Sequence, residues 1–244
     1  MTKVIRYTPE YLCMIADHGS PERHRHPTAH LVCAVEGTLR CTVGTTQVTC
    51  GGIMIRSEVA HEIQADGRMA VFLMANSSAI AERMTSQYLA SSDHAVLAEA
   101  AVSEIQALCR QARDDMDIQI LTLVGIDSEG KITADERVLA AIAEIEAAPS
   151  IGADMMAQLC QRTYLSQSRL SHLFKQETGD TLAGYLAFMK LRKAFEYAER
   201  GMCLTDAAMY AGFDSSSHLA ATCKRMFGIS LSAFLRSQKN IADL

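Results

Sequence analysis

The sequence predicts a two-domain α+β protein, with a β-barrel or sandwich in the N-terminal half and an all-α domain in the C-terminal half. Its 244 residues suffice for two modest domains, and 49% of them are hydrophobic. Short runs of alternating or β-branched residues recur up to about residue 75, whereas helical periodicity dominates afterwards. A polar, turn-rich segment separates two parts of the chain. We therefore assign 1–125 to the N-terminal domain, 126–135 to a linker and 136–244 to the C-terminal domain.

Short strands are predicted between about residues 5 and 75, where turn signals such as Gly51-Gly52 separate apolar runs. Several short strands at this spacing are typical of a sandwich or a small barrel. Helical periodicity then predicts helices within about 78–113, over 78–90 and 93–113. The predicted strands are His30–Glu36, Leu39–Val43, Thr46–Thr49, Ile53–Ile55 and Met69–Met74.

Charge is distributed unequally between the two halves. Residues 1–149 contain 12 Lys+Arg and 20 Asp+Glu, whereas residues 150–244 contain 11 and 8. The resulting net charges of −8 and +3 permit nucleic-acid binding by the second half but do not require it. The eight cysteines show no CxxC spacing, and no apolar run suits a signal peptide or a membrane span. We therefore expect a cytoplasmic protein with reduced thiols and no membrane partner.

Two segments of the C-terminal half repeat with an offset of 49 residues. The segment SQSRLSHLFKQETG (166–179) aligns with SSSHLAATCKRMFG (215–228). Each follows a tight turn and a short predicted helix, Asp154–Gln161 or Thr205–Tyr210. A helix, a short turn and a second helix opened by Ser is the helix-turn-helix pattern, in which Ser fixes where the second helix begins. The N-terminal residues of that second helix can reach base edges in the major groove of DNA.

Both second helices are predicted to present polar side chains to double-stranded DNA. Apolar residues at i, i+4 spacing, such as Leu170 and Phe174, should pack inward and leave the polar face outside. The intervening segment 181–201 predicts a helix of about 17 residues, ~26 Å long, which could hold the two recognition helices one DNA turn apart. The predicted DNA contacts are Gln167, Ser168, Arg169, Ser171, His172, Lys175, Ser216, Ser217, His218, Ala221, Lys224 and Arg225, with Lys190 and Arg192 as further candidates for phosphates.

These motifs resemble the DNA-binding domain of AraC/XylS-type regulators over residues 155–236. The match lies in SxxxLxxxFKxETG (166–179), YLxxxKLxxA (185–194), DAAxxAGF (206–213) and GxSxxxF (228–234). The resemblance implies a transcription regulator, not an enzyme, that acts on DNA with RNA polymerase. It also implies a homodimer formed through about 78–125, for which a buried intramolecular helix is the alternative. The family usually has Arg or Lys near His172 and Ala221, so this chain departs from it at base-contacting positions.

Four histidines in the N-terminal half resemble the two cupin motifs. The run HRHPTAHLVCAVEG (24–37) has the spacing of the first motif, and GGIMIRSEVAH (51–61) has that of the second. Carried over by position, the motifs bring His24, His26, His30 and His61 together in the mouth of a barrel, with His30 where the family has Glu. Residues 24, 26 and 30 share parity, so one strand face could present all three. Four imidazoles suit Zn, Ni, Co, Cu or Fe. The alternative is a metal-free pocket for an organic effector, with Pro27 breaking the strand.

Two functions follow from these patterns. In the first, the chain is a DNA-binding transcription regulator controlled by a small ligand or a metal in its cupin-like N-terminal domain. In the second, it is a metal-dependent cupin enzyme with an accessory helical domain. Besides the histidines, the barrel region offers only Glu22, Glu58 and Glu62 as evident acids or bases, and an enzyme would not need paired helix-turn-helix units. The sequence therefore favours the regulator.

Overall fold

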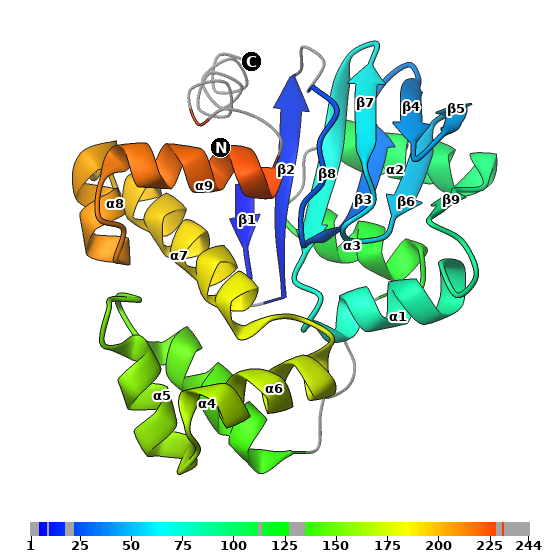
Figure 1. The fold of residues 1–244 in the computed structure, drawn as a ribbon. Helices are drawn as coiled ribbons and strands as arrows, with labels where there is room; N and C mark the ends of the chain where they lie inside the picture. The colour runs from blue at the N-terminus through cyan, green and yellow to red at the C-terminus, as the bar shows by residue number, and fades with distance from the viewer. Residues whose placement is uncertain are drawn as a thin grey trace.

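The protein is described by a computed structural model that covers residues 5–8, 10–17, 22–111, 114–126, 135–227 and 231. Figure 1 shows a β-rich N-terminal domain with three helices beside it, and a second group of helices that contains α4 to α9. This is the predicted α+β architecture with an all-α C-terminal half. Most of the predicted linker 126–135 and of the motif at 228–234 lies outside the described residues, so the domain limits stay a prediction.

The N-terminal strands form two antiparallel sheets that enclose an apolar interior. One sheet has the order β1-β2-β8-β3-β6-β9, and the other has the order β5-β4-β7. Side chains from both sheets, including Val32, Leu39 and Ile63, meet in one buried cluster. The strands are β1 (Ile5–Tyr7), β2 (Tyr11–Asp17), β3 (Ala29–Ala34), β4 (Leu39–Val43), β5 (Thr46–Cys50), β6 (Gly52–Ile55), β7 (His61–Ala65), β8 (Arg68–Met74) and β9 (His94–Val96).

Three helices cover the outer face of the six-stranded sheet. They are α1 (Ala79–Tyr88), α2 (Glu99–Gln111) and α3 (Met116–Leu123). The side chains of β3 alternate between this helical layer and the barrel interior, so all six of its residues are buried. That double burial explains why β3 is a continuous apolar run without polar alternation. The Gly51-Gly52 corner also lets α2 pack closely against the sheet, because a Cβ on Gly51 would clash with Val102 of α2.

The helix predicted over 93–113 is wrong at its beginning. Residues 94–96 form β9, which pairs with β6 in the register Ile53↔Val96 and Ile55↔His94, and α2 starts only at Glu99. The edge of β6 offers backbone donors and acceptors that three extended residues can satisfy. A tertiary partner therefore overrides the local helical pattern at these positions.

The C-terminal helices pack around a core that includes Leu159, Leu170 and Phe174, each fully buried. In Figure 1, α7 runs between the group formed by α4, α5 and α6 and the pair formed by α8 and α9. The buried ammonium of Lys193 on α7 donates to the Glu146 carbonyl oxygen at 3.2 Å near the end of α4. The helices are α4 (Glu136–Ala147), α5 (Met155–Thr163), α6 (Gln167–Thr178), α7 (Leu182–Glu199), α8 (Leu204–Ala211) and α9 (Ser216–Phe227).

Candidate DNA-binding surface and histidine cluster

The first helix-turn-helix unit consists of α5 and α6. Tyr164 ends α5 in the left-handed region, with φ 56°, and reverses the chain. Ser166 then caps α6, because its Oγ accepts a hydrogen bond from the Arg169 N–H at 3.4 Å. Leu170 and Phe174 point into the core, as their i, i+4 spacing predicted, and leave the opposite face of α6 to solvent.

The second unit, α8 and α9, repeats this construction with a different turn residue. Gly212 takes the left-handed conformation with φ +99°, where a Cβ would lie only 2.2 Å from the Ile151 carbonyl oxygen. The Ser215 hydroxyl accepts from the His218 N–H at 3.1 Å and caps α9. Leu219 and Cys223 are fully buried. Only glycine fits the close approach in this turn, whereas the first unit has room for a tyrosine.

Most of the predicted DNA contacts lie on the outer faces of α6 and α9. Ser171 and Ser216 are half-buried, and His218 Nδ1 lies 3.1 Å from Asp214 Oδ2. The Arg192 side chain is only 10% exposed and lies 3.4 Å from Glu196, so this candidate phosphate contact faces the protein instead. The exposed predicted residues are Gln167, Ser168, Arg169, His172, Lys175, Ser217, His218, Ala221, Lys224 and Arg225.

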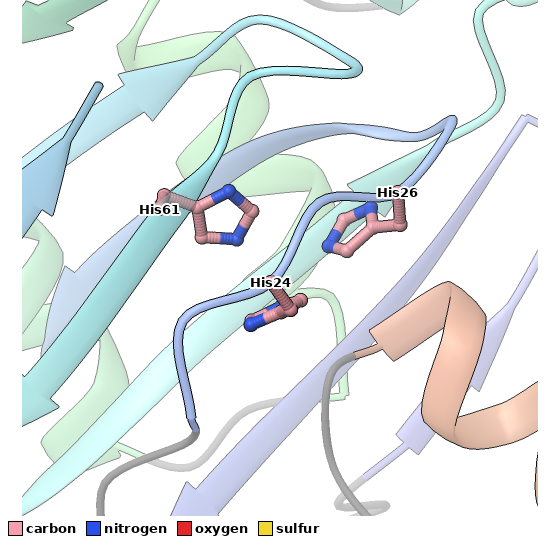
Figure 2. Close-up of side chains that lie close together, drawn as sticks. All are labelled: His24, His26 and His61. Carbon is pink, nitrogen blue, oxygen red and sulfur yellow. The ribbon is translucent and has the colours of Figure 1, made fainter.

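The four predicted histidines lie together at one end of the barrel. Figure 2 shows His24, His26 and His61, whose ligand nitrogens lie within 4.8 Å of one another. His30 Nε2 lies 2.7 Å from His26 Nε2. The prediction that one strand face carries three of them is wrong, because β3 begins at Ala29 and only His30 lies on it. His24 instead forms an isolated bridge with His61 of β7, and His26 lies in the loop that precedes β3.

Backbone carbonyls fix the tautomers of two of these rings. His24 Nδ1 lies 2.7 Å from the Glu22 oxygen, and His61 Nδ1 lies 2.8 Å from the Val59 oxygen. A carbonyl can only accept, so Nδ1 carries the proton in both rings and a neutral ring keeps the Nε2 lone pair free to bind. Burial lowers the pKa of His61 to about 4 and holds the pKa of His26 and His30 well below the usual histidine value. The cluster is therefore uncharged at neutral pH.

Neutral imidazoles with inward lone pairs are the donor set that a divalent transition metal requires. His24, His26 and His61 would supply three nitrogens, which leaves His30 as a fourth. The hydrogen bond between His26 and His30 would have to break for both rings to ligate, because one of the two Nε2 atoms now carries a proton. The residues present fit a metal, and the fit depends on that one proton.

Comparison with family models finds a match to a helix-turn-helix domain over residues 159–237. This range covers most of α5 and all of α6 to α9. Residues 159–237 thus form an AraC-type helix-turn-helix domain. A comparison with curated proteins found no match to the sequence.

The whole fold is similar to that of ToxT from Vibrio cholerae O395, with a TM-score of 0.56 at 10% sequence identity over 93% of this chain and 98% of that one. A ToxT structure with bound unsaturated fatty acid, from strain SCE256, matches with TM-score 0.56 and 10% identity over 95% and 97%. A third, bound to (E)-4-(8-methylnaphthalen-1-yl)but-3-enoic acid, gives the same score and identity over 94% and 99%. These likenesses concern the fold alone: a sheet-rich N-terminal domain with following helices, joined to a helical C-terminal domain.

Sequence reasoning missed two residues beside the first recognition helix of the AraC-type domain. Tyr164 is 95% exposed in the turn before α6. Asp180 is buried directly after α6. No motif signals either position, because Tyr164 occupies a left-handed turn position that glycine usually fills, and the burial of Asp180 follows from tertiary packing. Within the described residues, no helix is both long and apolar enough to cross a membrane.

Proposed function

We propose that this protein is a transcription regulator that binds double-stranded DNA through its AraC-type domain and senses a divalent transition metal through the histidine cluster of its barrel. The observation that carries the proposal is the pair of capped recognition helices with exposed polar and basic outer faces. Such a pair on one connecting helix suits consecutive turns of one face of DNA. A metal-dependent enzyme would have no use for it.

DNA binding is expected to depend strongly on salt. Arg169, Lys175, Lys224 and Arg225 are exposed on α6 and α9 and can neutralise phosphates, which releases counterions. Gln167 and His172 are long enough to reach base edges, whereas Ser217 and Ala221 are short. The first unit should therefore supply most of the base discrimination, and the second should position the protein on the backbone.

The metal part of the proposal is supported by the donor set. A bound divalent ion would supply a fixed positive charge that joins β7 to the segment with His24 and His26. A carboxylic acid is the second candidate effector, because two ToxT structures of similar fold contain one. The two candidates differ in what they need: the metal needs neutral imidazole nitrogens, and the acid needs a cation or N–H donors.

The test uses the purified full chain. Anisotropy of labelled DNA fragments, selected from a random pool, measures affinity at several salt concentrations, and calorimetric titration with Zn, Ni and Co measures metal uptake. We expect about one ion per chain for the wild type and none for His26→Ala/His61→Ala. His94→Ala is the matched control, because His94 lies on β9 outside the cluster. Failure to prefer any DNA at low salt contradicts the regulator, and a wild type that takes up no metal contradicts the metal sensor.

The same proposal includes a homodimer that acts in the cytoplasm with RNA polymerase. Large apolar side chains are partly exposed on α1, on β9 and on α3, namely Tyr88, Val96 and Ile118. These elements belong to the segment that the resemblance assigns to dimerisation. Light scattering after size-exclusion chromatography measures the oligomeric state. Ile118→Asp should shift the dimer toward monomer. A monomeric wild type contradicts the proposed homodimer.

A further inference from the structure

Three of the four clustered histidines have a partner that orients the ring, and the fourth has none at the same atom. His24 and His61 each donate Nδ1–H to a backbone carbonyl oxygen, and His26 Nδ1 lies 2.7 Å from Thr28 Oγ1. His30 Nδ1 is buried and has no hydrogen-bond partner within the part of the chain that the structure describes. A histidine that binds a metal almost always uses its other ring nitrogen in such a contact. By this criterion three of the rings are built as ligands and His30 is not.

Distances separate His30 from the other rings as well. The ligand nitrogens of His24, His26 and His61 lie within 4.8 Å of one another, and among the described residues this group does not include His30 (Figure 2). His30 Nε2 lies 2.7 Å from His26 Nε2, which is a hydrogen-bond length. Two nitrogens bound to one tetrahedral zinc ion are about 3.3 Å apart, so these two atoms are too close to be neighbouring ligands. In the metal-free protein they bind each other.

This hydrogen bond uses the atom of His26 that a metal needs. If His26 is the donor, its Nε2 carries the proton. If His30 is the donor, its proton occupies the lone pair of His26 Nε2. The two rings are 2% and 3% exposed, so water does not compete for the bond. A metal can therefore reach His26 Nε2 only after His30 has been displaced.

Thr28 determines whether His26 is then able to bind. Its hydroxyl can rotate, so it either donates to His26 Nδ1 or accepts from it. When it donates, a neutral ring carries its proton on Nε2 and cannot bind a metal. When it accepts, the proton lies on Nδ1 and Nε2 has a free lone pair. The metal-binding form of His26 is the one in which Thr28 accepts.

We propose that His30 competes with the metal for His26 Nε2 and is not a fourth ligand. In the metal-free protein His30 holds that atom, and metal uptake displaces it. Thr28 then accepts from His26 Nδ1 and keeps the ring in the tautomer that binds. The inference rests on the proposed function for its metal, and it departs from the cupin resemblance, which places a ligand at position 30. The competition sets the metal concentration at which the site fills, because a buried hydrogen bond that must be broken weakens uptake by about 5-fold.

The experiment titrates the full-length wild type, His30→Phe and His30→Ala with Zn²⁺ in a calorimeter. Phenylalanine keeps the ring without its nitrogens, and alanine carries the test if His30→Phe does not fold. We expect the folded variants to bind about one ion per chain, about 5-fold more tightly than the wild type. A ligand role predicts the opposite sign, so unchanged or weaker uptake by the folded variants overturns the proposal. His94→Ala is the control and should match the wild type, because His94 lies on β9 outside the cluster.

Thr28→Val and Thr28→Ser test the positioning role of the hydroxyl. Valine removes it at nearly the same volume, and uptake should weaken by roughly 10-fold, whereas serine keeps it and should match the wild type within about 2-fold. Thr163→Val is the matched control, because Thr163 is a buried threonine of the helical domain whose hydroxyl donates to the Leu159 carbonyl oxygen. Uptake by Thr28→Val equal to that of the wild type overturns the positioning role.

Nitrogen-15 spectra of the imidazole rings give a readout that altered packing does not produce. When Zn²⁺ is added to the wild type, His26 should carry its proton on Nδ1 and show a metal-bound Nε2. His30 should show no metal-bound nitrogen. A metal-bound nitrogen on His30, or a proton that stays on His26 Nε2, overturns the proposal.

The outcomes distinguish this inference from the proposed function. A wild type that takes up Zn²⁺ while the His30 variants take up less keeps the metal sensor and overturns the competition. A wild type that takes up no Zn²⁺ while a His30 variant does contradicts the sensor and supports the competition. If none of these proteins takes up Zn²⁺, both are contradicted, and DNA affinity alone decides whether the chain is a regulator.

Discussion

Replacing Gly212 by Ala is expected to disable the second helix-turn-helix unit while the barrel domain stays folded. Gly212 ends α8 with φ +99°, a conformation that L side chains rarely adopt. The new Cβ would lie 2.2 Å from the Ile151 carbonyl oxygen and 2.5 Å from its carbonyl carbon. Both atoms belong to the backbone before α5, so no side-chain rotation can relieve the clash.

The expected loss of stability in Gly212→Ala has three contributions. A left-handed backbone costs an L residue roughly 1–2 kcal/mol. Moving residue 151 away would break the hydrogen bond from the Ile151 N–H to the Ala211 oxygen, 3.1 Å long, and such a bond is worth about 1 kcal/mol. Ile151 is also 1% exposed, and partial exposure of its side chain adds roughly 1 kcal/mol. We expect a loss of about 3 kcal/mol or more in the stability of the helical domain.

The matched change in the first unit should act in the opposite direction. Tyr164 has the same left-handed role with φ 56°, and its side chain is 95% exposed, so little packing is lost on removal. Tyr164→Gly should therefore stabilise the helical domain by up to about 1 kcal/mol. The two substitutions test the same turn in two different environments.

Scanning calorimetry of the full chain, with the transitions fitted separately, measures both effects, because a two-domain protein need not unfold in one step. DNA affinity of Gly212→Ala should fall as well, since α9 is displaced relative to α6. If Gly212→Ala lowers the stability of the helical domain by less than about 1 kcal/mol, the Cβ clash argument is refuted. If Tyr164→Gly destabilises the domain, the tyrosine side chain packs against the protein, and the inference from its exposure is refuted.

Three further outcomes are expected. Gln167→Ala should weaken binding to the preferred site by roughly 1–3 kcal/mol and relax one or two base pairs, while Ser217→Ala costs much less; two equally constrained half-sites in a binding-site selection would contradict this. Burial raises the pKa of Asp180 to about 6, so the folded protein binds this proton more tightly than the unfolded chain. As the pH falls from 7 toward 4, the free energy of unfolding of the wild type should therefore rise by up to about 3 kcal/mol relative to that of Asp180→Asn. The charge of Glu58 acts on Asp180 in the same direction as burial, and equal pH profiles of the two proteins in calorimetry would contradict the prediction. Asp117→Ala should destabilise the barrel domain by about 2–4 kcal/mol, because it removes the partner of the Tyr11 hydroxyl at 2.7 Å and of Arg6 at 2.9 Å; a melting temperature equal to wild type would refute it.

The helix-turn-helix units were predictable because their signals are local. Ser166 and Ser215 mark the beginnings of α6 and α9, and apolar residues four apart identify the buried face. The meeting of the histidines was also predicted, from the spacing of the two cupin motifs. The added expectation that one strand face presents three of them was wrong, because a bridge between His24 and His61 brings His24 into the cluster. Pro27 was expected to break the strand between the histidines, and it lies in the loop that carries His26 into the cluster.

Features that depend on distant partners left no trace in the pattern. β9 has strand conformation because β6 has a free edge, and its own three residues do not demand it. Asp180 has the sequence context of an ordinary polar residue before a helix, and only tertiary packing buries it. Arg192 was predicted as a phosphate contact because periodicity cannot tell which polar side chains of α7 are buried, and this one is only 10% exposed beside Glu196 of the same helix.

The two outermost strands of the large sheet have a consequence for how copies of this protein meet. β1 and β9 are each three residues long, and they end the six-stranded sheet on its two sides. A free edge can recruit a strand from another molecule, which is the usual origin of domain swapping and fibrils. Three residues give an incoming strand too few hydrogen bonds to hold it. On the smaller sheet, the edge strand β5 exposes Thr46, Gln47 and Thr49 instead of apolar side chains. Within the part of the chain that the structure describes, strand pairing at β1, β9 and β5 therefore contributes little to self-association.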